Sequence, residues 1–201
     1  MAKRKVKAVD PWKLKKWYTI LAPKVWGEKE VGETAADEPE KLIGRTVTLP
    51  ATDLTGSIGH VQYLLKFQIV DVAGSTAKTE FVGYELDNAF IKRLTRRHTS
   101  KIETVFDAKS RDGKTLHIKA FVWTAVRASN AQAKAIRKLV MQEISEFVSK
   151  KDAADAMKEF VVGNFMKGVA EKVKKILPVR RAEVAKVRVV EKLVATEAAA
   201  A

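Results

Sequence analysis

Residues 102–126 have the alternation of a two-stranded β-hairpin, and no other part of the chain limits the fold as strongly. Apolar and polar residues alternate over Ile102–Ala108 and over Leu116–Val126, and the segment between these two runs, Ser110–Lys114, contains Asp-Gly, a pair typical of tight hairpin turns. One face of the second strand is apolar, with Leu116, Ile118, Ala120, Val122 and Val126. The other face mixes charge with large rings: His117, Lys119, Phe121, Trp123 and Arg127.

The segments around the hairpin predict more strands first and helices afterwards. Residues 46–49, 62–72 and 78–86 alternate like strands, and Asp87 is placed to cap a short helix over residues 88–97. After Arg127 the apolar period becomes helical. We expect one helix beginning at Ser129 or Asn130, a second capped by Asp152 that ends near Gly163, and a third from Phe165 to Pro178. Residues 27–44 hold six acids with Gly and Pro, which favours a loop.

These segments predict an α+β fold. We expect one domain over residues 17–194, in which an antiparallel, barrel- or sandwich-like β-rich core (45–127) is followed by helices (129–177) and a closing strand (184–194) that returns to the sheet. A basic arm (1–16) precedes this domain and a short tail (195–201) follows it.

The charge balance indicates a polyanionic partner. Lys and Arg number 38 and Asp and Glu 24, which gives a formal net charge of +14, and nucleic acid is the commonest polyanion that such a surplus serves. The cations form clusters, and the candidate RNA-binding residues are Lys3, Arg4, Lys5, Lys7, Lys13, Lys15, Lys16 and Trp17; Lys92, Arg93, Arg96, Arg97, His98 and Lys101; Lys134, Arg137 and Lys138; and Arg180 and Arg181, which follow Lys172, Lys174 and Lys175. A single cluster fits a solvated face equally well, but several together favour nucleic acid. No helix-turn-helix, zinc-finger, basic-zipper or RRM signature is present, so we expect contacts to backbone and shape more than to bases.

Catalytic, metal and membrane functions have no support in the sequence. There is no cysteine, and His60, His98 and His117 are far apart and without metal-binding spacing. Gly56–His60 has neither the phosphate-loop pattern nor a nucleophile elbow, so a turn is the better interpretation. We therefore expect no catalytic site, no metal and no cofactor. No apolar run reaches about 18 residues, and the basic start lacks the apolar core of a secretory signal, so no membrane partner is expected.

Several long segments resemble one known family. KWYTILAPKVWGEKEVGET (16–34), KLIGRTV (41–47), RRHTSKIET (96–104), KTLHIKAFVWT (114–124) and RASNAQAKAIRKLVMQEI (127–144) are together similar to the archaeal and eukaryotic small-subunit ribosomal proteins called S-three-a-e, or eS-one, and most to archaeal members. The similarity runs in order from about Lys16 to Leu193.

The resemblance implies a structural, non-enzymatic protein of the cytoplasmic ribosome. In this family the protein lies on the platform of the small subunit near the mRNA exit, and it contacts rRNA and neighbouring ribosomal proteins. The mRNA near the exit and initiation factors are further candidate partners, and no homo-oligomer is expected. A free-standing, translation-associated RNA-binding factor remains the alternative.

The family's function gives the aromatic residues among the first lysines a role. We expect Lys13, Lys15 and Lys16 to lie against phosphates, while Trp17, Tyr18 and Trp26 stack on bases or riboses, enter a groove of a neighbouring protein, or anchor the segment on the β core. Anchoring is the stronger expectation for Trp26. The acidic residues of 27–44 would repel rRNA, so this segment should face solvent or a basic neighbouring protein.

Overall fold

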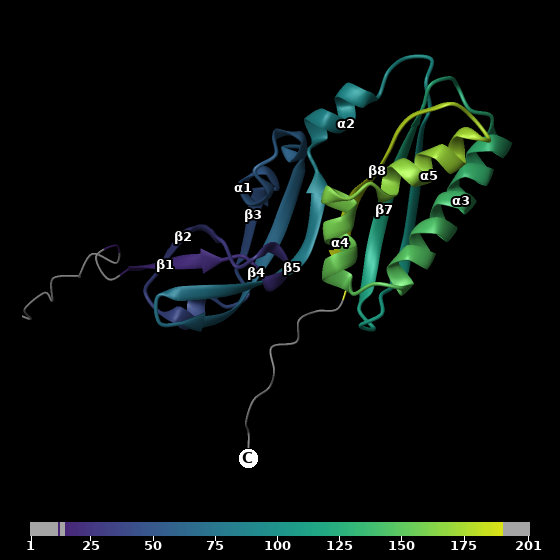
Figure 1. Cartoon of the computed structure of the whole chain (residues 1–201). Coiled ribbons are helices and arrows are strands. Elements are labelled where there is room, and N and C mark those ends of the chain that lie inside the picture. The colour runs from purple at the N-terminus through teal and green to yellow at the C-terminus, as the bar shows by residue number, and fades with distance from the viewer. Residues whose placement is uncertain (1–11, 13–14, 191–201) are drawn as a thin grey trace, which may run out of the picture. The chain divides into compact units, whose positions relative to one another are not determined.

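The predicted hairpin is confirmed. In the computed structural model, which describes residue 12 and residues 15–190, β6 (Lys101–Lys109) pairs along its whole length, antiparallel, with β7 (Thr115–Thr124) (Figure 1). Gly113 turns the chain with φ of +81°, a left-handed conformation that glycine adopts at no steric cost, and the Ser110 N–H donates to the Lys114 carbonyl across the turn at 3.0 Å.

Two compact units make up the fold, and they are described separately. The first contains the described residues up to Val47 together with Phe67–Glu80, and the second contains Thr48–Lys66 and the described residues from Phe81 onward. The strands β4 (Tyr63–Ala73) and β5 (Thr76–Leu86) contribute residues to both units. Our expectation of a single domain over residues 17–194 stays a prediction.

In the second unit a sheet is covered on one face by helices. β8 (Val179–Val189) pairs antiparallel with β7 on one side and with residues 83–85 of β5 on the other. The helices α3 (Asn130–Ser149), α4 (Ala153–Val162) and α5 (Phe165–Lys174) lie on one face of these strands (Figure 1). The apolar face predicted for β7 is buried at Leu116, Ile118, Ala120 and Val122, and the helices bury Ile136, Val140, Ile144, Met157 and Val173.

The starts of α3 and α4 show one confirmed cap and one correction. Ser129 and Gln132 form a capping box at α3, as the Ser129 hydroxyl accepts from the Gln132 N–H. Asp152 stands at the N-cap of α4, but its carboxylate does not cap the helix and instead binds Arg111 at 2.9 and 3.2 Å. The capping hydrogen bond comes from the hairpin turn, where Asp112 accepts from the Ala153 N–H at 3.0 Å.

In the first unit the sheet includes two strands that precede the predicted β-rich core. β1 (Lys16–Leu21) pairs antiparallel with β2 (Glu30–Ala36) and parallel with residues 76–78 of β5. Short 3-10 helices follow at η2 (Lys24–Trp26) and η3 (Pro39–Leu42). The core of this unit holds Tyr18, Ala36, Leu42, Ile69 and Ala77.

The prediction of a loop over residues 27–44 is therefore wrong for Glu30–Ala36, which form β2. β2 is an edge strand: among the described strands it pairs with β1 alone. Its acids Glu30 and Glu33 are exposed and cost nothing in burial there, so the strand forms despite its charge.

The remaining elements agree with the predictions except at their ends. β3 (Thr46–Pro50), α1 (Thr52–Thr55) and η4 (Ile58–His60) precede β4. Asp87 caps α2 (Asn88–Leu94) as predicted, but the helix ends before residue 97. β8 begins immediately after Pro178, five residues earlier than predicted, and ends at Val189; residues 191–194 of the predicted strand lie outside the described residues.

The α+β class is confirmed: within the described residues there are eight strands, paired mostly antiparallel, and five α-helices, and the last strand returns to the sheet. None of the described helices combines the length and apolarity needed to cross a bilayer.

Candidate nucleic-acid interface

Six of the predicted RNA-binding residues gather where α2 ends and β6 begins, a surface called here the basic tip: Lys92, Arg93, Arg96, Arg97, His98 and Lys101. The helix ends at Thr95, whose hydroxyl donates to the Ile91 carbonyl at 3.0 Å and accepts from Trp123 Nε1 at 3.2 Å, which ties the chain to β7. His98 then turns the chain with φ of +61°. All six side chains are exposed.

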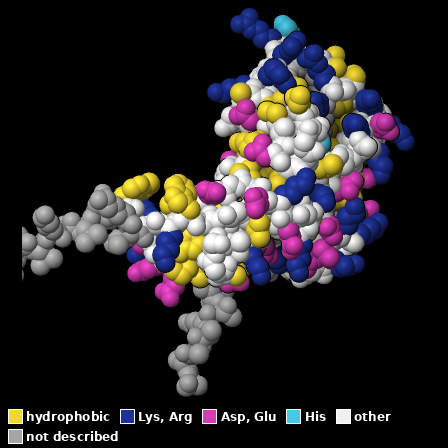
Figure 2. Space-filling view, turned by 60° about the vertical axis from the view of Figure 1, so that its left-hand side comes forward, with side chains coloured by type: hydrophobic (Ala, Val, Ile, Leu, Met, Phe, Trp, Pro, Cys, Tyr) yellow, Lys and Arg dark blue, Asp and Glu magenta, His cyan; other side chains and the backbone are white. Residues whose placement is uncertain are grey.

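The basic tip carries its charge without local compensation. The sequence has no acid between Asp87 and Glu103. Within residues 15–190, the structure gives Lys92, Arg96 and Arg97 no ion-pair partner. Figure 2 shows dark-blue Lys and Arg side chains gathered, with a His among them, at the end of the second unit. Since the charges are exposed and uncompensated, they are available to a polyanion.

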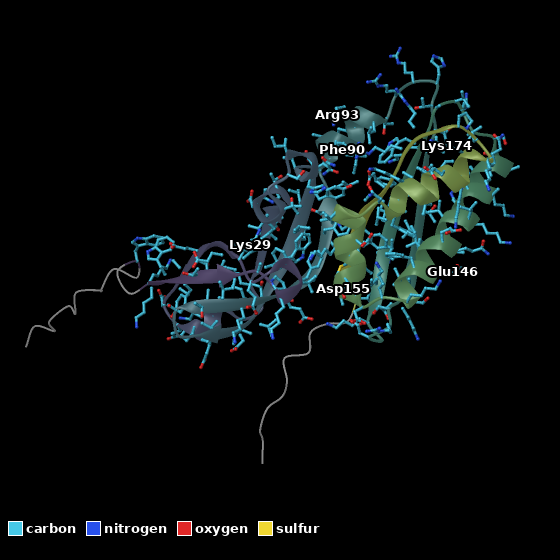
Figure 3. The ribbon with its side chains drawn as sticks, viewed as in Figure 1. Lys29, Phe90, Arg93, Glu146, Asp155 and Lys174 are labelled. Atoms are coloured by element: carbon cyan, nitrogen blue, oxygen red, sulfur yellow. The ribbon has the colours of Figure 1, made fainter. Side chains whose placement is uncertain are left out.

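A single ring brings two predicted clusters together. The guanidinium carbons of Arg93 and Arg181 lie 5.2 and 5.0 Å from the centre of the Phe90 ring. Figure 3 shows Phe90 and Arg93 on α2. The sequence predicts the basic tip and the Arg180–Arg181 pair as separate clusters and Phe90 as an apolar residue of the helix, whereas in the structure Phe90 joins the two clusters through cation–π contacts.

The strand register supplies a second link. Lys101 is opposite Trp123, and Trp123 is opposite Arg181, so the three residues form one row across β6, β7 and β8. The Lys101 ammonium lies 4.4 Å from the centre of the Phe121 ring, which meets the Trp123 ring edge-on at 5.6 Å. The two rings predicted for the charged face of this strand are thus buried, and they support the cations beside them.

Behind Arg181 lies a buried polar network. Arg181 Nε donates to Glu183 at 2.7 Å, and the Tyr63 hydroxyl donates to the other Glu183 oxygen at 2.8 Å. Burial, and then the Glu183 carboxylate, raise the pKa of Tyr63 well above its ordinary value. Burial also raises the pKa of Tyr84, whose ring packs edge-on against Tyr63 at 6.0 Å. This network fixes the direction in which Arg181 leaves the sheet.

The third predicted cluster divides into two kinds of residue. Lys134, Arg137 and Lys138 are all exposed on α3. Arg137 Nε donates to the Glu103 carbonyl at 3.0 Å and so holds the helix against β6. Lys134 and Lys138 have no such partner among the described residues, so they are the better candidates for phosphate contact.

The aromatic residues of the first unit also divide. Trp17 is 62% exposed beside the exposed Lys16, whereas Trp26 is 6% exposed and Tyr18 is 5% exposed. Trp26 and Tyr18 therefore anchor the segment, and Trp17 remains available for stacking. Trp12, which sequence reasoning left out, is equally exposed, and the Lys15 ammonium lies 4.4 Å from its ring centre. The arm residues Lys3, Arg4, Lys5, Lys7 and Lys13 lie outside the described residues.

Three lysines on the open face of the second unit's sheet are, by contrast, neutralised. Lys119 pairs with Glu103, and Glu85 accepts from Lys66 at 2.9 Å and from Lys186 at 3.0 Å. Although burial raises the pKa of Glu85, the two lysines lower it more, so the net shift is downward. These three lysines are thus weaker candidates for RNA contact than the basic tip. No group of three metal-ligating side chains occurs in the described part of the chain.

Comparisons with known proteins point to one family. The Ribosomal S3Ae family model, the S-three-a-e family of the resemblance above, matches residues 3–192. Small ribosomal subunit protein eS1 of Staphylothermus marinus is 40% identical over 185 residues, which are 92% of this chain and 87% of that protein. The eS1 protein of Saccharolobus islandicus is 40% identical over 182 residues (90% of this chain, 88% of that protein). That of Desulfurococcus amylolyticus is 37% identical over 187 residues (93% and 88%).

Proposed function

The chain belongs to the Ribosomal S3Ae family, and on that premise we propose that it is a structural component of the small ribosomal subunit, without enzymatic activity, that binds rRNA and neighbouring ribosomal proteins. The proposal includes the location implied by the family resemblance, in the cytoplasmic ribosome on the platform near the mRNA exit. There, mRNA and initiation factors are further candidate partners.

The basic tip is the observation that carries the proposed RNA contact. Five permanent cations lie between Asp87 and Glu103 without an acid among them, and Phe90, Phe121 and the β6–β7 register hold two of them, Arg93 and Lys101, in place. Cations fixed on a rigid support lose less conformational entropy when they bind phosphate than freely moving side chains do. The surface therefore suits sequence-independent contact with an RNA backbone.

Trp12 and Trp17 extend the proposed RNA contact to the first unit. Both rings are exposed, each has a lysine beside it, and base stacking on such a ring contributes about 1–3 kcal/mol. Stacking on rRNA and insertion into a neighbouring protein are both compatible with this exposure. The exposed Glu28, Glu30 and Glu33 would repel phosphates, and we assign them to solvent or to a basic neighbouring protein.

Sedimentation tests the proposal directly. Cell extract is separated on a sucrose gradient at low and high salt, and this chain is detected in each fraction. Retention in the small-subunit peak at high salt is the expected result. Migration to the top of the gradient would instead support a free-standing, translation-associated factor. Chemical probing of small-subunit rRNA, with and without the chain, then tests whether the basic tip protects the backbone.

A further inference from the structure

A groove in the second unit, separate from the residues assigned above except for Arg180 and Arg181, is lined by four cations. It has a volume of about 540 Å³ and lies between α5, the start of β8 and η4; the cations are Lys167, Lys174, Arg180 and Arg181. Lys167, Lys174 and Arg180 are exposed and have no ion-pair partner within the described residues. Of the two acids that line the groove, Glu183 is engaged by Arg181 and Tyr63, and Glu171 is exposed.

A second hollow of about 360 Å³ continues this groove toward the basic tip. Gln62 lines both hollows, and Arg181 of the first and Arg93 of the second contact the same Phe90 ring. Asp87, which also lines the second hollow, is already used to cap α2. The two hollows together are called here the basic groove.

The η4 segment gives the basic groove an apolar side. Ile58 is 84% exposed and Val61 is 53% exposed, and both line the second hollow. His60, which lines the first hollow, is held in orientation because its Nδ1 lies 3.1 Å from the Thr55 hydroxyl and its ring meets Tyr63 edge-on at 6.3 Å. Exposed branched apolar residues beside a fixed ring form a surface on which a flat apolar group can rest.

From this arrangement we propose that the basic groove binds a short unpaired stretch of RNA, with its phosphates on Lys167, Lys174 and Arg180 and its bases against Ile58, Val61 and His60. Only a single strand presents backbone charge and uncovered base faces together, since a duplex stacks its bases inside. The guanidinium planes of Arg93 and Arg181 on Phe90 offer further stacking surfaces of the kind that unpaired bases use. The inference rests on the proposed function and deepens it by naming the RNA structure that one surface recognises.

Binding of a fluorescein-labelled, single-stranded oligouridylate to the full chain tests the charged side. The variant Lys167→Gln/Lys174→Gln/Arg180→Gln should lower the salt dependence, d log K/d log[salt], by about 2, because each lost phosphate contact on a single strand accounts for roughly 0.7. The matched control is Lys109→Gln/Lys150→Gln/Arg188→Gln, which removes three exposed cations that do not line the groove. An equal loss in both variants would overturn the proposal, because it would show that only net charge matters.

The apolar side has its own variant. Ile58→Ser should weaken oligouridylate binding roughly three- to tenfold through lost base contact and leave the affinity for a duplex of the same length unchanged. Since Ile58 is almost fully exposed, folding should be unaffected, and circular dichroism checks this. Equal weakening with single strand and duplex would contradict a role in contacting bases.

Two further experiments identify the ligand and its source. A competing peptide that alternates Asp with Leu should not displace the oligouridylate; full displacement with higher affinity would replace RNA by an acidic protein segment and overturn the proposal. A photoreactive group introduced at Lys174 in assembled subunits, followed by sequencing of the crosslinked RNA, distinguishes the subunit's own rRNA from any other RNA. If the groove variants bind like the wild type while the chain still sediments with small subunits, this inference fails and the proposed function stands.

Discussion

Replacing Gly83 by alanine should destabilise the sheet of the second unit. Gly83 on β5 is paired with Arg188 on β8 in the antiparallel register, and the backbone of β8 leaves no room for a side chain at Gly83. A Cβ placed there would overlap the carbonyl oxygen of Val187 and lie 3.1 Å from that carbonyl carbon and 3.2 Å from the Cα of Arg188. All three atoms are backbone, so no rotamer change can relieve the overlap.

The size of the effect follows from what must move. The two strands would have to separate by roughly 1 Å, and overpacking of this kind typically costs about 1–3 kcal/mol. The strained stretch, residues 83–85 of β5 against 186–188 of β8, is the whole of this strand pairing, so little of it can remain unaffected. For a chain of this size the thermal midpoint should fall by roughly 2–12 °C.

Gly168 provides a control, because the same substitution by alanine should there raise the stability instead of lowering it. It lies within α5, where an added Cβ has no heavy atom within 4 Å. Alanine has a higher helix propensity than glycine by about 1 kcal/mol, so Gly168→Ala should raise the midpoint by roughly 2–4 °C. Guanidinium titration and calorimetry measure both variants. A Gly83→Ala chain as stable as the wild type, or a less stable Gly168→Ala chain, would refute the packing argument.

Three other predictions test separate parts of the structure. Arg96→Gln/Arg97→Gln on the basic tip should lower the salt dependence of binding to a small-subunit rRNA fragment by about 1.5 without changing the melting temperature; an unchanged slope would remove the tip from the interface. The pKa values of Tyr63 and Tyr84 are raised in the folded chain, so their contribution to stability is fully present below the ordinary tyrosine pKa and decreases as the pH rises above it. The guanidinium concentration at the unfolding midpoint should therefore decrease as the pH is raised from about 9 to about 11, while the folded chain shows no phenolate absorbance from these two residues. Asp112→Ala should cost about 1 kcal/mol through the lost cap of α4. Burial raises the pKa of Asp112, but its hydrogen bonds, that from Ala153 first, together with Lys114 lower it more, so the net shift is downward. The difference in stability from wild type should therefore be present at neutral pH and shrink in acid, as the pH falls through that lowered pKa.

Local sequence was sufficient to predict the elements that have strong local causes. The hairpin followed from alternation on both sides of Asp112-Gly113, the start of α3 from Ser129, and the start of α2 from Asp87. Element ends were less predictable because they depend on distant partners. α2 stops at Thr95, where Trp123 Nε1 binds the threonine hydroxyl, and nothing in residues 88–97 indicates this partner 28 positions away.

Charge pattern alone misled where pairing supplies the stability. The acids of residues 30–36 suggested a loop, yet this segment forms β2 because β1 offers a partner edge and the acids stay in water. Similarly, Asp152 has the position of a cap, but Arg111 holds its carboxylate and Asp112 caps the helix from across 41 positions. Both contacts come from Arg111 and Asp112 in the hairpin turn, and only the tertiary structure places this turn at the start of α4.

The same reasoning applies to the candidate interface, where the sequence predicts the cations and only the fold decides which of them are free. Lys66, Lys119 and Lys186 are spaced along strands and are neutralised there by Glu85 and Glu103. The acids thus compensate these three lysines, while the basic tip and the basic groove keep most of their charge. Aromatic side chains, and not carboxylates, support Arg93 and Lys101 of the tip, so these two cations are fixed in position without losing their field. A surplus of +14 spread evenly would bind any polyanion weakly, whereas charge concentrated on supported positions can select RNA by the spacing of its phosphates.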